Sequence, residues 1–425
     1  MTVVGSKLSQ EAQVSWLLVV CWCLSIAQYG YRYIFQVNDT RTSNTAFYSS
    51  TPWYFSIVKF EILGAVLIYG CYRLLVMRRV PRFRSEIGLS WVALMVSLLV
   101  FALRMGADST SVVELLQDYC HLWPFFLLTA MLPLLVRREQ VEPTLRKFSH
   151  YGFWLCFPFW ILTVYLYFEN NRYPALSWPG HLRFGGILDD PNAYGILMSL
   201  LMVLGFEFKG SLWRFRVAAA TLMLVTTQSF SSYLLLIFVV SYYTIRLLRP
   251  TLKTGAARPA IAAFGMLLVL SGIFVAAQFS SARLETELDS LWRFKQTSVL
   301  VHLDHLRFPD EMADASLFKW LFGGIGQSEN AFNYILLNFG LVGLLAYTTV
   351  LGAFLGLAFK TRTGWGRALA FWVAATVADS VAIPFLAVFP INLLIWTILS
   401  CIILHNRKKA QWALQEIPEA VLQAA

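Results

Sequence analysis

The stretch Ala331–Phe359 reads AFNYILLNFGLVGLLAYTTVLGAFLGLAF and contains no charged side chain. About twenty consecutive apolar residues are enough for a helix to cross the hydrocarbon core of a bilayer. The stretch therefore predicts a membrane-spanning helix with residues to spare. A long polar interval, residues 278–330, comes directly before it, and further apolar runs lie on both sides. This alternation indicates a helical membrane protein.

The composition of the whole chain agrees with this class. Of its 425 residues 58% are hydrophobic and only 14% are charged, whereas soluble domains carry about 25% charged residues. We expect an all-α fold, a polytopic bundle of about 12 transmembrane helices. No stretch remains for a separate soluble domain, so residues 1–425 form a single integral membrane domain. The expected spans are residues 14–35, 53–76, 87–104, 111–136, 151–168, 191–207, 216–228, 231–247, 259–278, 331–359, 368–386 and 389–405.

The net charge of +10 reflects orientation in the membrane and not a nucleic-acid partner. Lysine and arginine cluster in alternate connections between spans, and cytoplasmic loops are enriched in these residues. We therefore expect a bacterial inner-membrane protein with both termini in the cytoplasm. The first apolar run, residues 14–35, has no small-residue cleavage site after it and predicts a retained span. All six cysteines lie in apolar runs, which predicts neither structural disulfides nor a zinc site.

The polar interval, residues 278–330, forms the large loop on the predicted periplasmic side. Such a loop could be part of a working site or a mere connector. Leucine and tryptophan recur every three or four residues between 284 and 306, with charges opposite them, a pattern typical of an amphipathic helix. A second short helix is expected to begin at Asp310, which can cap it, and to present Leu317 and Trp320 at the membrane interface.

One motif lies at the start of the predicted sixth span. Residues 183–195 read RFGGILDDPNAYG, in which Asp190 is a good helix N-cap and Pro191 a favourable first helical residue. A helix N-terminus with Arg183 nearby could bind a phosphate, with Asp190 and Asn192 lining the site. The alternative is that Asp190 only caps the helix and Arg183 only anchors it at the interface. The spacing leaves both interpretations open.

Ionisable residues inside predicted spans form a second group. Glu114, Asp118 and His121 lie three and four residues apart, which places them on one face of the fourth span. Charged groups in the membrane usually line a cavity or pair with one another. These three residues therefore either bind substrate or are neutralised by basic residues such as Arg104, and the sequence does not decide between them. Asp379 is a further charged residue, inside the eleventh span.

The large loop contributes a third group. Arg283 and Arg293 lie ten residues apart, on nearly one helical face, where they could reach phosphates, and Trp292 could bind a sugar ring. Glu329 and Asn330 lie at the start of the tenth span, where a carboxylate could act as general base on a hydroxyl. The alternative is that Glu329 only stabilises the helix start through the dipole. His302 and His305 lack further ligands and are interpreted as surface residues.

Several of these segments, in this order, resemble the O-antigen ligase and Wzy-type polymerase superfamily. The resemblance covers residues 183 to 345 and is supported by about twelve expected spans and the large loop before a late span. The segments are RFGG at 183–186 with DPN at 190–192, TQS at 227–229, SARL at 281–284, LFGGIG at 321–326 and NFGLVG at 338–343.

The resemblance implies a membrane-embedded glycosyltransferase that uses a glycan on undecaprenyl diphosphate, without a cofactor or metal. Arg183 and Arg283 would hold the diphosphate, and Glu329 would act on the acceptor hydroxyl. The partners would be a lipid-linked donor, a lipid-linked acceptor, the bilayer and a chain-length regulator protein. Ligases of this family carry a histidine near the end of the loop, where this chain has QSEN at 327–330. This departure favours a polymerase over a ligase that acts on lipid A core.

Two other classes of function stay open. A transporter or flippase for a lipid-linked glycan or a small anion would need charged groups along its whole path, whereas the predicted inner halves of the spans are apolar. A non-catalytic assembly partner would make no product when purified alone.

Overall fold

The computed structural model describes residues 16–27, 85–107, 138–170, 184–188, 190–252, 312–313, 315–324, 330–381 and 390–406, with a few isolated positions between them. Within these ranges every regular element is a helix and no strand occurs, which confirms the all-α prediction. The helices are Trp16–Ala27, α5 (Ser85–Ala107), α8 (Arg138–Asn170), the 3-10 turn η2 (Gly186–Leu188), α9 (Pro191–Glu207), α10 (Trp213–Thr226), α11 (Phe230–Leu252), α14 (Leu317–Phe322), α15 (Ala331–Phe359), α16 (Gly364–Asp379) and α17 (Ile391–Asn406).

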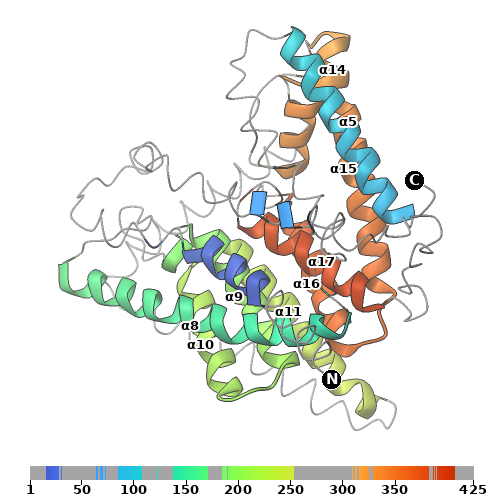
Figure 1. Cartoon of the computed structure of the whole chain (residues 1–425). Helices are drawn as coiled ribbons and strands as arrows, with labels where there is room; N and C mark the ends of the chain where they lie inside the picture. Colours follow the sequence, from blue (N-terminus) through green and yellow to red (C-terminus); the bar gives the residue numbers. More distant parts are fainter. Residues whose placement is uncertain are drawn as a thin grey trace.

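Helix α9 is the centre of the bundle (Figure 1), packed against α8, α10, α11, α16 and α17. Its residues Pro191 and Ala193 to Gly205 are all buried. A helix that is apolar on every side is enclosed by protein or by lipid. Here the neighbouring helices of the bundle enclose α9. The predicted span at 191–207 therefore coincides with a helix of the same bounds, and two of its neighbours, α16 and α17, come from far along the chain.

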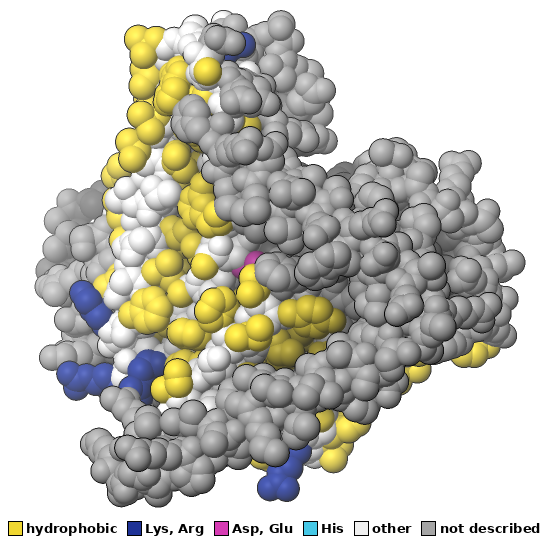
Figure 2. Space-filling model, turned by 180° about the vertical axis from the view of Figure 1, so that it is seen from behind, with side chains coloured by type: hydrophobic (Ala, Val, Ile, Leu, Met, Phe, Trp, Pro, Cys, Tyr) yellow, Lys and Arg dark blue, Asp and Glu magenta, His cyan; other side chains and the backbone are white. Residues whose placement is uncertain are grey.

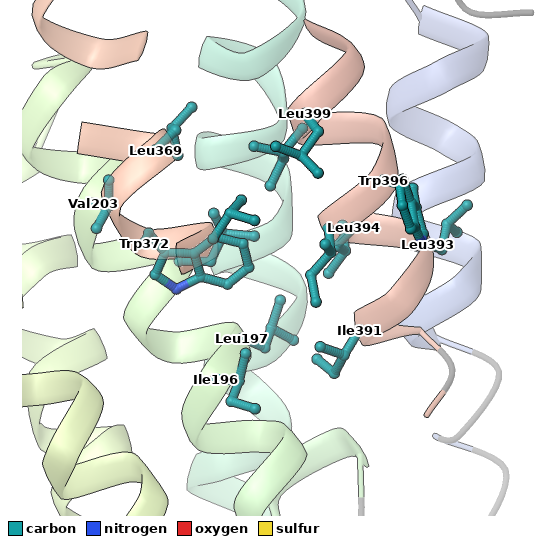
Figure 3. Packing of buried hydrophobic residues seen from close by; sticks show 14 of the residues in the cluster. Ile196, Leu197, Val203, Leu369, Trp372, Ile391, Leu393, Leu394, Trp396 and Leu399 are labelled. Carbon is teal, nitrogen blue, oxygen red and sulfur yellow. The ribbon is translucent and has the colours of Figure 1, made fainter. Parts of the chain in front are cut away.

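The contact between α9 and the last two helices consists of large side chains. Figure 3 shows Leu369 and Trp372 of α16 beside Val203 of α9, with residues of α17 such as Leu394 on the other side. The Trp372 indole N–H donates to the Ser199 hydroxyl at 2.8 Å, so the polar atom of this buried ring has a partner. Buried indole groups without such a partner would be destabilising.

Helix α15 consists of two halves joined at Gly340, whose φ of 67° and ψ of −174° are not helical. A break of this kind removes backbone hydrogen bonds and leaves carbonyl groups without intrahelical donors. Two of these carbonyls have other donors. The guanidinium of the buried Arg104, on α5, donates to the Asn338 carbonyl, and the Gly324 amide, just after α14, donates to the Leu337 carbonyl at 2.7 Å.

The ends of two helices differ from the predictions. Helix α14 begins at Leu317 and not at Asp310, because the Ser316 side chain accepts the Lys319 amide at 3.4 Å and so caps it. Helix α16 ends at Asp379, earlier than the predicted boundary at 386. The sequence that follows contains Pro384, which lacks an amide donor and disfavours helix at the residue before it.

Only part of the predicted membrane topology can be compared with the structure. By length and composition, two described helices can cross a membrane, Gly88–Gly106 within α5 and Ala331–Phe359. The other apolar helices in the described part are shorter, among them Trp16–Ala27 and Ile391–Asn406. The predicted spans at 53–76, 111–136 and 259–278 lie almost wholly outside the described residues. The number of crossings, about twelve, stays a prediction.

Basic side chains gather at one end of the described bundle, which we call the basic end. On the face of the molecule that Figure 2 shows, most of the lysine and arginine side chains lie in the lower part, below a surface rich in hydrophobic side chains. Arg246 of α11 pairs with Glu207 at the end of α9, and Trp365 of α16 contacts His405 of α17 with ring centroids 4.8 Å apart. The described basic residues of this end are Arg138, Arg146, Lys147, Lys209, Arg214, Arg216, Arg246, Lys360, Arg362 and Arg367.

Candidate functional site

The N-terminus of α9 has the predicted cap. Asp190 is extended, with φ −98° and ψ 113°, and its carboxylate accepts the Asn192 amide at 2.8 Å, while Pro191 is the first helical residue. One amide donor of this helix end is therefore already bound. A phosphate at this end would depend on Arg183, which lies outside the described residues.

The turn between α10 and α11 packs against this helix start. The Ser229 hydroxyl donates to the side-chain oxygen of Asn192, and the Ser229 amide donates to the Thr227 hydroxyl at 3.3 Å. Gln228 between them has a φ of 48°, a left-handed conformation that is uncommon for residues other than glycine. The segment at 227–229 is thus held in an unusual turn beside Asn192.

Helix α11 approaches α9 most closely at Gly195. A Cβ atom on this glycine would lie 1.7 Å from the Ser232 hydroxyl oxygen, so any side chain there would displace α11. The Ser232 hydroxyl is buried and has no hydrogen-bond partner among the described residues. A buried polar group without a partner is uncommon in native proteins. The close contact therefore leaves a free hydroxyl inside the bundle.

A buried carboxylate lies at the same end of α11. Asp379, the last residue of α16, is 8% exposed and makes a side-chain hydrogen bond with Ser231. Its Oδ2 atom is buried and has no hydrogen-bond partner in the part of the chain that the structure describes. Burial of a carboxylate with incomplete hydrogen bonding is costly, and such groups concentrate at functional sites. Asp379 therefore provides a free acceptor atom.

Asn330 joins α15 to this region. Its side chain caps α15 by accepting the amides of Phe332 at 2.9 Å and Asn333 at 3.2 Å. The next amide, of Ala331, donates to the carbonyl of Ser380 at 3.0 Å. Because Ser380 follows Asp379 directly, the first turn of α15 lies beside the buried carboxylate.

We call this region the polar end. It joins the starts of α9, α11 and α15 to the end of α16. Three predicted site residues lie in it, Asp190, Asn192 and Asn330, and all three make helix-capping or turn contacts. The remaining predicted site residues lie outside the described part of the chain: Arg183, Arg283, Trp292, Arg293, Glu329, Glu114, Asp118 and His121.

Sequence reasoning did not assign Ser231, Ser232 or Asp379 to the site. The available signal for Asp379 was its charge within an otherwise apolar run. The two serines had no such signal, because serine is common in membrane helices and the residues they contact here, Asp379 and Gly195, lie on other helices. Only their tertiary contact distinguishes them from other serines of the chain.

The chemistry of the polar end suits a hydroxylated ligand. Carboxylate and amide oxygens accept hydrogen bonds from hydroxyl groups, and a carboxylate can also take up their proton. The described basic residues belong to the basic end, apart from Arg104 and Lys319, so a diphosphate at the polar end would require arginines outside the described part. Among the described residues, no three His, Cys, Asp or Glu side chains are grouped so as to hold a metal ion.

No family model matches the sequence, and no curated protein matches it. The function must therefore be inferred from the residues themselves.

Proposed function

We propose that the chain is a glycosyltransferase of the bacterial inner membrane that joins undecaprenyl-diphosphate-linked glycan units on the periplasmic face. The reaction would need no metal, and the diphosphate would be the leaving group. The observation that supports this proposal best is the polar end, where the buried Asp379 makes a side-chain hydrogen bond with Ser231 and its Oδ2 atom has no partner among the described residues. The motif resemblance of residues 183 to 345 supplies the substrate class.

The distribution of charge supports the proposed orientation. Cytoplasmic segments are enriched in lysine and arginine, so the basic end faces the cytoplasm in our proposal. The polar end is formed by the opposite ends of α9, α11 and α16, and it then faces the periplasm, where lipid-linked glycans are joined. The membrane is crossed about twelve times, and both termini are cytoplasmic.

In the proposed reaction, a hydroxyl oxygen of the acceptor glycan attacks the anomeric carbon of the donor. The bond from that carbon to the diphosphate breaks, and its electrons leave with the diphosphate. Arg183 and Arg283 stabilise the charge on the leaving group, because guanidinium groups pair bidentately with phosphate oxygens. The hydroxyl proton passes to a carboxylate. Direct displacement inverts the anomeric configuration.

Two carboxylates are available for the proton. Glu329 directly precedes Asn330, the cap of α15, and Asp379 is the buried carboxylate of the same end. We assign the proton transfer to Glu329 and the orientation of the acceptor hydroxyl to Asp379. Sugar rings would bind along Glu114, Asp118 and His121, as expected from the sequence.

The test is glycan lengthening by the purified protein. Folded protein is mixed with lipid-diphosphate repeat units in EDTA, and the products are separated by gel electrophoresis. We expect ladders of longer glycans from the wild type, and little or no lengthening from Arg183→Ala and Arg283→Ala. The proposal would be overturned if the folded wild-type protein did not lengthen the glycan.

Asp379 is tested with a matched control. Asp379→Asn keeps the shape of the side chain and removes its charge, and we expect a loss of about 100-fold or more in rate. The matched control is Glu207→Gln. Glu207 is also the last residue of a helix and its side chain is only 7% exposed, but it lies at the basic end. If both variants lose equal activity per folded molecule, Asp379 has no specific role.

A transporter of lipid-linked glycan is the second candidate, because transporters bind substrate at broken helices and α15 is broken at Gly340. Two of the carbonyl groups near this break are already bound, to Arg104 and to the Gly324 amide. We therefore favour the enzyme. Flipping of the lipid in sealed vesicles without glycan joining would favour transport instead. Offering lipid A core as acceptor separates a ligase from a polymerase.

A further inference from the structure

The connection between α9 and α10 places cations and apolar side chains together on the surface of the basic end. Lys209 and Arg214 are exposed, and the neighbouring Leu212 and Phe215 are 61% and 43% exposed. Leu212 has a φ of 55°, a left-handed conformation that is rare for a bulky residue. An exposed leucine in this conformation does not contribute to the core and is available for a contact outside the protein.

The two exposed cations lie over one aromatic ring. Lys209 Nζ is 5.2 Å and Arg214 Cζ is 5.6 Å from the ring centroid of Trp213. Among the described residues the ion pairs are Arg146 with Glu142 and Arg246 with Glu207, so neither of these two cations has a carboxylate partner. Tryptophan flanked by cations is typical of a membrane interface.

A third cation lies beneath the turn. Arg216 is only 4% exposed, and its Nη1 donates to the Ser149 carbonyl of α8 at 3.1 Å. Its Nη2 points at the turn, 3.3 Å from where a Cβ atom on Gly210 would lie, and its buried Nε–H has no hydrogen-bond partner within the described ranges. The charge of Arg216 is therefore directed toward the turn and is not neutralised by a described carboxylate.

The N-terminus of α10 adds to this positive field. Its N-cap residue, Leu212, makes no side-chain hydrogen bond to the helix, and its first turn contains no acidic residue. Uncapped amides and the helix dipole favour an anion at such an end. Together with the Arg216 guanidinium, whose buried Nε–H has no partner among the described residues, they define a site for a negatively charged oxygen group.

We propose that the α9–α10 turn binds the phosphate headgroup of an anionic phospholipid in the cytoplasmic leaflet. Lys209, Arg214 and the α10 N-terminus contact the phosphate, while Leu212 and Phe215 enter the acyl region below it. A free phosphate would use the same cations but would leave both apolar side chains in water. The inference rests on the proposed placement of the basic end at the cytoplasmic surface, and it does not depend on glycosyl transfer.

The test uses the full chain in phosphatidylcholine vesicles that contain spin-labelled phosphatidylglycerol or spin-labelled phosphatidylcholine. Electron paramagnetic resonance measures the lipid fraction immobilised by the protein. We expect a several-fold preference for phosphatidylglycerol, since each basic residue near an anionic surface contributes roughly fivefold. Lys209→Gln with Arg214→Gln should remove most of this preference. The matched control, Lys360→Gln with Arg362→Gln, removes the same amount of charge elsewhere at the basic end. This variant should keep the preference for phosphatidylglycerol.

Three results would overturn the proposal. The wild type could show no preference for phosphatidylglycerol, the two double variants could lose the preference equally, or excess inorganic phosphate could abolish it at constant ionic strength, which would identify a free-phosphate site. Helix content measured by circular dichroism checks that the variants fold, and the single variant Arg214→Gln replaces the pair if it does not. Glycan lengthening is measured on the same samples, so the two proposals fail separately.

Discussion

Replacing Gly340 with alanine tests whether the break in α15 is built into the fold. The backbone at this position has a φ of 67° and a ψ of −174°, a region that is essentially restricted to glycine. A Cβ atom there would also lie 2.3 Å from the backbone carbonyl of Leu321, at the end of α14. Because backbone atoms cannot rotate away as a side chain can, α14 and the two halves of α15 would have to separate.

The cost follows from these two effects. Holding alanine in this backbone conformation costs about 1–3 kcal/mol, and the clash with Leu321 adds to it. If α15 instead becomes one continuous helix, the strain disappears but the hydrogen bonds from Arg104 and Gly324 to its carbonyls are lost. Each donor or acceptor left buried without a partner costs about 1–3 kcal/mol. Either outcome lowers the free energy of unfolding by at least about 1 kcal/mol.

The assay is unfolding of the purified protein in mixed micelles by titration with a denaturing detergent, followed by tryptophan fluorescence. Gly352→Ala in the same helix is the matched control, because a Cβ atom there meets nothing within 4 Å. Alanine in a helix is favoured over glycine by about 0.5–1 kcal/mol, so the control should be neutral or stabilising. Equal stability of the Gly340 and Gly352 variants would refute the proposed role of the break.

Three further predictions concern stability and are measured by thermal unfolding. Arg104→Ala removes the donor to the Asn338 carbonyl and should destabilise the protein by about 1–3 kcal/mol, whereas an unchanged midpoint would show that water replaces the guanidinium. Ser199→Ala leaves the buried Trp372 indole N–H without its acceptor and should cost a similar amount; an unchanged midpoint would contradict the bond. Burial and, to a lesser extent, a nearby arginine lower the pKa of His150, so protonation of this side chain destabilises the folded protein. The protein should therefore keep its full stability above about pH 6.5 and lose stability as the pH falls below that value. The His150→Gln variant should lose less stability at low pH. A pH profile of stability identical to that of the wild type would contradict this role of His150.

Local signals predicted some elements with accurate bounds. The sequence DPN at 190–192 predicted the start of α9 because an aspartate cap and a following proline act within a few residues. Local signals also misled. Asp310 is as good a cap as Ser316, and only the structure shows that α14 begins after Ser316. The sequence likewise predicts the end of α16 too late, at residue 386, because the apolar run continues past Asp379, where the helix ends.

The candidate site could be predicted only in part. Asp190, Asn192 and Asn330 were assigned from helix-start motifs, and the structure shows each of them at a helix start. The contact of Asp379 with Ser231 could not be predicted, since it joins helices that are distant in the sequence and neither residue belongs to a motif. The same holds for Arg104, whose acceptor is a backbone carbonyl beside a glycine break and carries no sequence signature.

The enclosure of α9 has a consequence for biosynthesis. A chain is made from its N-terminus, and α9 is complete long before α16 and α17 exist. Until Trp372 reaches Ser199, the side of α9 that α16 and α17 cover lacks these neighbours and is open to lipid, an insertion factor or a chaperone. A chain that stops before α16 should therefore be recognised as incomplete and degraded. In the described part of the chain, α16 and α17 are the last helices to join the packing around α9.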